Sequence, residues 1–285
     1  MAYLEREMRG KFQYANQYSP DFLEKVKSVC LYLATKLGDI MNEVTIVGGL
    51  VPSLIIEQEE SSYERHVGTM DLDIGFDIAL LDSGKYVEIS QRLKSAGFEP
   101  DKNETGNLTF QRWKIDEPEV TIDFMISPVS KADKGGTLIN LDKNFAAVIT
   151  PGLSLAFKDR LNLNIEGNTV NGAKAQRNIW VCGPGAYVVL KSLAFGMRGE
   201  NKDAYDLYYV IRNYGKDVDD VAKPLRNLMA DNNAKKAIEI LKRNFTDIDG
   251  VGPVRVALFL EGKRNDEIQS QVVALIKNLL NILSL

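Results

Sequence analysis

Hydrophobic and polar residues alternate most clearly in two stretches of the chain, and each stretch predicts a half-buried β-strand. In the first, Asp71 and Asp73 alternate with apolar positions, which are Leu72, Ile74, Phe76 and Ile78. In the second, Asp123 is opposed by the apolar positions Val120, Ile122, Phe124 and Ile126. Residues two apart on a strand share a face, so the carboxylates point away from the apolar side chains. Each strand is therefore expected to bury one face and to leave an acidic face open.

A shorter apolar stretch precedes the first acidic strand and ends in two glycines. Residues 44–47, Val-Thr-Ile-Val, lead directly into Gly48 and Gly49. Residues without Cβ let backbone N–H groups approach a phosphate at the start of a helix. The glycine pair is thus a candidate phosphate-binding turn, and the alternative is an ordinary turn before a helix.

The three acidic residues Asp71, Asp73 and Asp123 are candidate metal ligands and candidate catalytic residues. Carboxylates that converge within a few ångströms repel one another unless divalent cations neutralise them. Hard oxygen ligands suit Mg²⁺ or Mn²⁺ better than Zn²⁺. Two such ions about 4 Å apart can activate an attacking hydroxyl and stabilise a leaving oxygen in phosphoryl or nucleotidyl transfer.

The remaining patterns predict an α+β fold in two domains. Helices are expected at 20–38 and 83–96, strands at 108–115 and 119–126, a loop at 127–136 that would suit a flap, and β-like segments within 141–181. After Gly183-Pro184-Gly185 the periodicity is helical, with helices expected at 187–197, 205–213, 218–229, 234–245 and 266–283. We therefore divide the chain into an α/β domain, 1–182, and a helical C-terminal domain, 183–285.

The order of strand, glycine pair, helix, Asp-x-Asp strand and single-Asp strand resembles the nucleotidyltransferase superfamily that includes DNA polymerase beta. The resemblance implies a mixed sheet with helices for residues 1–182. The stretch between Gly49 and Asp71 is longer than in compact members of that superfamily. Its additional residues fall in the polar segment 57–68, which is expected to be a loop, where insertions cost little.

A second motif narrows the resemblance. Lys191, Arg198 and the run Lys202-Asp203-x-x-Asp206-Leu are similar to the AbiEii/AbiGii subgroup of toxin-type nucleotidyltransferases. The resemblance implies that Gly48, Gly49, Lys191 and Arg198 hold the NTP, with contributions from Lys202 and Asp206. It also implies a toxin–antitoxin or abortive-infection (phage-defence) role, in which the toxin modifies the 3′ end of tRNA or another RNA and a cognate antitoxin neutralises it.

These helical residues also have simpler interpretations. Lys191 and Arg198 are seven residues apart, which places them along one helix stripe that a solvated basic face would also explain. Asp203 suits an N-cap. The aromatic residues Tyr205, Tyr208 and Tyr209 suit packing between helices, with stacking on a base as the alternative. His66 is expected in a loop, where it is a candidate phosphate contact, and Ser53 on a helix surface.

Composition excludes several other classes of protein. The chain has 285 residues, 45% hydrophobic and 26% charged, which is ordinary for a globular protein. It has no apolar run of the roughly 18 residues that a membrane helix needs and no apolar signal segment after Met1, so a cytoplasmic location without a membrane partner is expected. Cys30 and Cys182 support neither a disulfide framework nor a zinc site. A single histidine excludes multi-histidine metal sites.

The sequence therefore predicts a Mg²⁺-dependent nucleotidyltransferase that passes NMP from an NTP to an acceptor. The net charge of −4 limits RNA contact to a local basic surface, with a modest surplus of Lys and Arg in 183–245. The same charge leaves open an aminoglycoside-type enzyme that modifies a small molecule. A catalytically idle NTP-binding regulatory protein is the third interpretation. The acceptor itself is not indicated by the residues.

Overall fold

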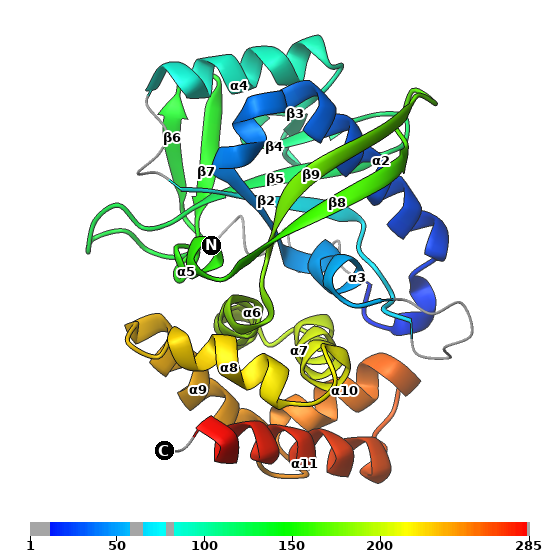
Figure 1. The fold of residues 1–285 in the computed structure, drawn as a ribbon, viewed down its shortest axis with the longest axis vertical. Helices are drawn as coiled ribbons and strands as arrows, with labels where there is room; N and C mark the ends of the chain where they lie inside the picture. The colour runs from blue at the N-terminus through cyan, green and yellow to red at the C-terminus, as the bar shows by residue number, and fades with distance from the viewer. Residues whose placement is uncertain (1–11, 58–64, 78–82, 284–285) are drawn as a thin grey trace. The chain divides into compact units, whose positions relative to one another are not determined.

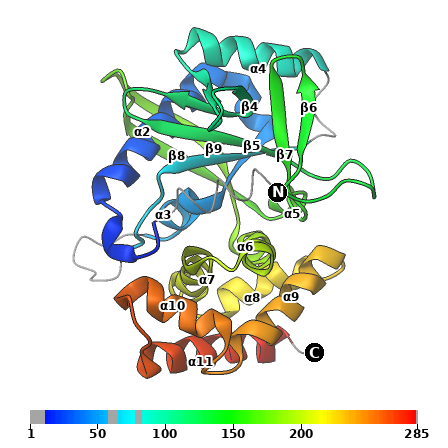
Figure 2. The same cartoon turned by 180° about the vertical axis from the view of Figure 1, so that it is seen from behind.

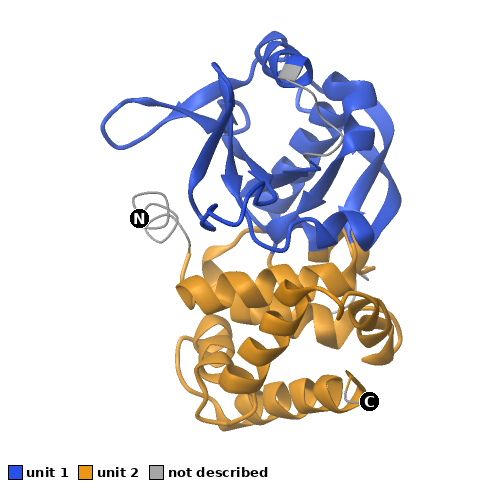
Figure 3. Cartoon of the chain, turned by 90° about the vertical axis from the view of Figure 1, so that its left-hand side faces the viewer, with its two compact units in different colours: residues 1, 20–51, 68–182 blue, residues 2–19, 52–67, 183–285 orange. Residues whose placement is uncertain are grey.

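The computed structural model describes residues 12–57, 65–77 and 83–283, which form two compact units (Figures 1 and 3). Unit 1 comprises the described residues within Pro20–Val51 and Gly68–Cys182, and unit 2 comprises those within Ala2–Ser19, Pro52–Val67 and Gly183–Leu285. Unit 1 ends at the residue where the sequence was divided. The described parts of 2–19 and 52–67, however, group with unit 2, although the division by sequence kept them with 1–182.

Unit 1 is built on a mixed sheet, which confirms the α+β class. Along the sheet the strands are ordered β3-β4-β5-β2-β1-β9-β8, and β6 and β7 branch from β5. β2 runs parallel to β5, β5 to β7, and β1 to β9, while the other pairs are antiparallel. The strands are β1 Val44–Val47, β2 Asp71–Phe76, β3 Glu99–Lys102, β4 Leu108–Ile115, β5 Val120–Ile126, β6 Leu138–Asp142, β7 Phe145–Ile149, β8 Arg160–Asn168 and β9 Lys174–Cys182.

Alternation along β2 and β5 produces the core of unit 1. The apolar residues expected to face inward are fully buried, namely Leu72, Ile74, Phe76, Ile122, Phe124 and Ile126. Phe76 and Phe124 stack with ring centroids 5.4 Å apart, and both rings contact Phe145 of β7. Burying several aromatic rings at one place provides a large hydrophobic driving force. The opposite face of the same strands is left for polar side chains.

Among the described residues, helices α2 (Pro20–Leu37) and α4 (Ser83–Ser95) pack against this sheet, and the short α5 (Leu155–Lys158) contacts β1 and β9. α2 contacts β2, β5, β8 and β9, and α4 lies beside α2 and contacts β6 and β7 (Figures 1 and 2). α2 begins at the predicted proline and ends directly before Gly38, which confirms that prediction. The expected helix at 83–96 is confirmed by α4, and Gly97 follows it with a positive φ of 84°. Glycine adopts such a backbone conformation without steric cost.

The predicted β-hairpin at 108–126 is confirmed by β4 and β5, which pair antiparallel. Residues 127–136 form turns and bends, as expected of a loop. β3 was not predicted, because its sequence Glu-Pro-Asp-Lys has no apolar alternation and contains a proline. Parts of two predictions, residues 58–64 of the expected loop at 57–68 and Ile78 of the first acidic strand, lie outside the described residues.

Unit 2 is helical in its described C-terminal part. Its helices are α6 Pro184–Arg198, α7 Asn201–Asn213, α8 Asp219–Asn227, α9 Asn232–Phe245, α10 Val251–Glu261 and α11 Asp266–Leu283, and a short 3₁₀ turn η1 spans Ala15–Gln17. α7 is the central helix, since it contacts α6, α10 and α11 and is buried from Asn201 to Ile211. The five predicted helices are present. α10 was missed because Gly252 and Pro253 near its start are typical helix breakers.

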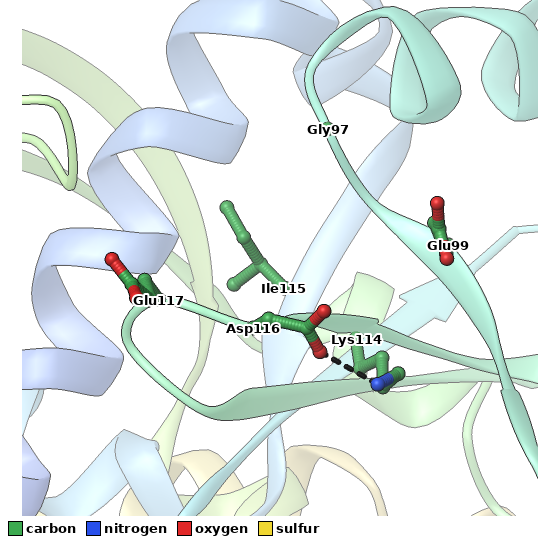
Figure 4. A pocket seen from close by; sticks show the side chains of 6 residues that line it. All are labelled: Gly97, Glu99, Lys114, Ile115, Asp116 and Glu117. Carbon is green, nitrogen blue, oxygen red and sulfur yellow. Dashed lines mark hydrogen bonds and ion pairs between the residues drawn. The ribbon is translucent and has the colours of Figure 1, made fainter.

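A shallow pocket of about 380 Å³ lies at the edge of the sheet in unit 1. It is lined by Gly97, Glu99, Lys114, Ile115, Asp116 and Glu117, and Lys114 forms an ion pair with Asp116 at 2.6 Å (Figure 4). None of the candidate site residues lines it. No helix within the described residues is long and apolar enough to cross a membrane.

Candidate functional site

The three carboxylates selected from the sequence lie together on one face of the sheet in unit 1. Asp73 of β2 is paired directly with Asp123 of β5, and Asp71 lies two residues earlier on the same face. Each residue offers one oxygen, and these oxygens lie within 4.8 Å of one another. Asp123 is fully buried, whereas Asp71 and Asp73 are half-buried. The parallel pairing of β2 and β5 therefore assembles an acidic group with the composition of a divalent-cation site.

Arg112 was not anticipated from the sequence, and it holds Asp123. β4 places Arg112 directly opposite Asp123 in the antiparallel pair. Its Nε donates to Asp123 Oδ1 at 2.6 Å, and its Nη2 donates to Oδ2. A bidentate arginine–carboxylate contact fixes orientation and partly compensates a buried negative charge. The cross-strand register of the predicted hairpin was the signal that would have revealed this residue.

The glycine pair packs against the acidic strand. Gly48 has φ +72°, and a Cβ built on it would lie 1.7 Å from Asp73 Oδ2. A Cβ on Gly49 would lie 2.6 Å from Thr69 Oγ1, and that hydroxyl donates to Asp71 Oδ1 at 2.5 Å. The helical segment after the glycines is short, with a 3₁₀ turn η3 at Gly48–Leu50 and α3 at Val51–Ile55. The structure thus explains both glycines by close packing beside the carboxylates, and their contact with phosphate stays a prediction.

The charged residues of the helical motif form a second cluster, within unit 2. Lys191 of α6 contacts Asp203 Oδ1 at 3.1 Å and Asp206 Oδ2 at 2.8 Å. Lys202 contacts both oxygens of Asp206, at 2.8 and 3.0 Å. Arg198 donates from Nε and Nη2 to the two oxygens of Asp203, at 2.6 and 2.9 Å. The helical spacing of the α7 residues places both carboxylates on the side that faces α6.

Burial and mutual attraction determine the charge of this cluster. Burial disfavours the charge on Asp206, but Lys191 and Lys202 outweigh it and hold the Asp206 pKa well below its ordinary value. Burial also opposes the charge on Lys191, yet Asp206 and Asp203 raise the pKa of Lys191. For Lys202, burial prevails and lowers the pKa. The cations of the cluster are Lys191, Arg198 and Lys202, and among the described residues they contact the carboxylates of Asp203 and Asp206.

His66 and Ser53 belong to this second cluster. His66 Nε2 lies 2.8 Å from Asp206 Oδ1, and His66 Nδ1 lies 3.2 Å from Ser53 Oγ. His66 lies in an irregular segment, as expected, but its side chain is buried, and Ser53 is buried instead of lying on the surface of its helix. Burial lowers the pKa of His66 to about 4. Sequence reasoning missed the pair because its members are distant in the chain and tertiary packing brings them together.

Two further interpretations are decided by the described contacts in α7. The side chains of Tyr205, Tyr208 and Tyr209 are buried, which supports packing between helices over base stacking. Asp203 is the third residue of α7, and Glu200 occupies the N-cap, so the capping interpretation of Asp203 was wrong. Asp203 instead pairs with Lys191 and Arg198.

The predicted site residues therefore fall into two groups. Unit 1 holds Gly48, Gly49, Asp71, Asp73 and Asp123, and unit 2 holds Lys191, Arg198, Lys202 and Asp206. No protein-family model matches the chain, and no curated protein sequence matches it significantly. The functional argument consequently rests on the chemistry of these two groups.

Proposed function

We propose that this protein is a Mg²⁺-dependent nucleotidyltransferase with the polymerase beta-like arrangement of the superfamily named above. The observation that carries the proposal is the group of three carboxylates, Asp71, Asp73 and Asp123, whose oxygens lie within 4.8 Å of one another beside a glycine turn. In the proposed reaction, the acceptor oxygen forms a bond to the α-phosphorus of the NTP. The bond to the bridging oxygen breaks, and pyrophosphate leaves.

The carboxylates fit a divalent cation as its ligands. They supply hard oxygen donors on one sheet face, and two of the three side chains are half-exposed. Asp71, Asp73 and Asp123 would hold Mg²⁺ or Mn²⁺. When bound, such ions would activate the acceptor hydroxyl and stabilise the leaving oxygen. Thr69 and Arg112 hold Asp71 and Asp123 in place through hydrogen bonds.

Asp123 is proposed to orient the acceptor hydroxyl and to help remove its proton. The Arg112 contact engages both of its oxygens, which favours the orienting part of this role. Gly48 lets the Asp73 carboxylate pack against its backbone, because a Cβ there would lie 1.7 Å from Asp73 Oδ2. The backbone N–H groups of the glycine turn are proposed to bind a phosphate of the nucleotide.

The second cluster supports binding of the triphosphate. It gathers three cationic side chains on the neighbouring helices α6 and α7, and lysine and arginine are the side chains that bind phosphate groups. The side chains of Lys191 and Arg198 are 11% and 13% exposed to solvent. They are the proposed phosphate contacts. Asp206 and Lys202 would orient Lys191.

The acceptor is proposed to be RNA, with the 3′ end of tRNA as the first candidate, through the resemblance to AbiEii/AbiGii toxins. In that role a cognate antitoxin would restrain the enzyme. The net charge of −4 favours a second candidate, a small-molecule nucleotidyltransferase. The Arg112–Asp123 pair favours a third, an idle NTP-binding protein, because the arginine already compensates the charge of Asp123.

One experiment separates these functions. Purified protein is incubated with labelled NTPs, Mg²⁺ and either total tRNA or an aminoglycoside panel, beside the Asp73→Asn variant. Label on tRNA that Asp73→Asn abolishes supports the proposal, and label on a drug supports the second candidate. NTP binding without transfer supports the third. Transfer that persists in Asp73→Asn contradicts the carboxylate mechanism.

A further inference from the structure

His66 is the buried titratable group that the proposed reaction does not use. Its ring lies against α7, stacked on Tyr205 at 5.5 Å between ring centroids and edge-on to Tyr209 at 4.9 Å. The next residue, Val67, donates its backbone N–H to Tyr205 Oη at 3.4 Å. With the Asp206 contact, His66 and its neighbour meet three residues of α7. The ring is therefore held in one orientation by packing.

The partners of His66 determine which ring nitrogen carries the proton. Asp206 is ionised and can only accept, so Nε2 must donate to it. In the neutral ring Nδ1 is then an acceptor, and the Ser53 hydroxyl donates to it. Among the described residues, the ring lies against Ser53 of α3 and against Tyr205, Asp206 and Tyr209 of α7, with the cations Lys191 and Lys202 nearby. A second proton would enter a fully buried position beside two cations, and burial outweighs the attraction of Asp206, so the neutral ring is retained.

Asp206 needs this donor because of its position between two lysines. Lys202 reaches both of its oxygens, and Lys191 reaches Oδ2. The His66 bond to Oδ1 completes the contacts of a carboxylate with no exposed side-chain surface. Without it, Oδ1 would keep the Lys202 contact, and the carboxylate could rotate towards that lysine. The Lys191 ammonium would then lose its 2.8 Å contact.

We propose that His66 is a positioning residue that fixes the Asp206 carboxylate and, through it, the Lys191 ammonium. Ser53 completes the chain of hydrogen bonds by donating to Nδ1 of His66. The inference deepens the proposed function, on which its nucleotide readout rests, because Lys191 is a proposed phosphate contact. His66 itself touches no reacting atom in this scheme.

The bond pattern has a direct test that does not depend on activity. His66 is the only histidine of the chain, so ¹⁵N-histidine labelling of protein without a histidine tag gives one imidazole signal. The expected spectrum shows the Nε2–H tautomer, unchanged between about pH 8 and about pH 5.5. A proton on Nδ1, or protonation with an ordinary pKa, overturns the proposal. Ser53→Ala is expected to keep the tautomer and to broaden the signal.

The positioning role is tested by nucleotide binding and turnover. His66→Phe keeps an aromatic ring against Tyr205 but removes both hydrogen bonds, and His66→Gln retains a donor. NTP affinity by calorimetry is expected to fall about 10-fold or more in His66→Phe and to be partly recovered in His66→Gln. KM for NTP should rise more than kcat falls. Tyr208→Phe, which removes a hydroxyl from the same helix away from the cluster, is the matched control.

The outcomes separate the inference from the proposed function. Equal NTP affinity in the parent and in His66→Phe overturns the positioning role, and so does a loss in Tyr208→Phe as large as in His66→Phe. If His66→Phe does not fold, His66→Gln and Ser53→Ala give the same comparison. A parent protein that binds no NTP removes the proposed function. The imidazole signal then decides the His66–Asp206 bond by itself, with the Nε2–H tautomer supporting it and the other tautomer overturning it.

Discussion

Gly48 lies so close to Asp73 that a single added carbon would occupy the position of the carboxylate. A Cβ on Gly48 would be 1.7 Å from Asp73 Oδ2, and the residue has φ +72°. We expect Gly48→Ala to abolish transfer and to reduce the increase in Tm that Mg²⁺ produces. Thermal unfolding with and without Mg²⁺ measures the second effect.

Gly97 offers a matched control for that substitution. It has φ +84°, and no atom lies within 4 Å of the position that a Cβ would occupy there. Gly97→Ala therefore reports the backbone strain alone, which is about 1 kcal/mol. Equal losses in the two variants would show that contact with Asp73 contributes nothing at Gly48.

Removing one charge from the three carboxylates should impair metal binding while leaving the fold stable. Asp71→Asn and Asp73→Asn are expected to reduce transfer at least about 10³-fold with little loss of stability, because both side chains are half-exposed. Mg²⁺ should raise the Tm of the parent and not of either variant. Asp116→Asn, in the exposed ion pair with Lys114, is the control. A Tm increase that persists in Asp73→Asn would place the ion elsewhere.

Asp123→Asn is expected to behave differently from the other two substitutions. It removes a charged partner of Arg112 at a buried position, so the free energy of unfolding should fall by about 2–4 kcal/mol. Transfer should also be lost. Chemical denaturation of the single and double variants with Arg112→Met measures the coupling. If the double variant is no more stable than Asp123→Asn alone, the contact that Arg112 loses is not the cause of the destabilisation.

The sequence contained enough information for the carboxylates but not for their partners. Asp71, Asp73 and Asp123 follow from strand alternation, which is local, and the parallel pairing of β2 with β5 brings them together. Arg112 depends on which residues of a hairpin lie opposite each other, and His66 depends on packing between segments 140 residues apart. Such relationships have no local periodicity.

The helices and strands also divide into those that local sequence spacing predicts and those that depend on tertiary packing. α2, α4 and the helices of unit 2 with regular apolar spacing were predictable. β3 was not, because an edge strand of four largely polar residues depends on pairing with β4 for its conformation. α10 was not, because packing against α7 and α11 outweighs the low helix propensity of its first turn.

Acidification should destabilise the fold through His66. Burial lowers the pKa of His66 from 6.5 to about 4 in the folded protein, so the unfolded chain binds this proton more readily between those values. Stability is full above about pH 6.5 and is lost as the pH falls towards 4, by about 3 kcal/mol at most. Denaturation of the parent and of His66→Gln across this range isolates the contribution. Parallel pH profiles would contradict it.

Asp206 should be the costliest charged residue to replace in unit 2. Asp206→Asn leaves Lys191 and Lys202 with one fewer buried carboxylate, and the expected loss is about 3–5 kcal/mol. Asp219→Asn, at an exposed position in the first turn of α8, should cost less than about 1 kcal/mol. Urea denaturation of both variants gives the comparison, and similar losses would mean that the cluster does not depend on Asp206.

The chain leaves unit 1 after Val51 and returns to it at Gly68, and this path restricts how the protein can be dissected. A fragment that stops at Cys182 would keep the strands of the sheet, yet the described residues 52–57 and 65–67 would lack the helices of unit 2 with which they group. Ile56 and His66, both buried in the intact chain, would then face water and promote aggregation. Isolating the sheet for crystallisation or screening would require a short linker in place of the segment between Val51 and Gly68.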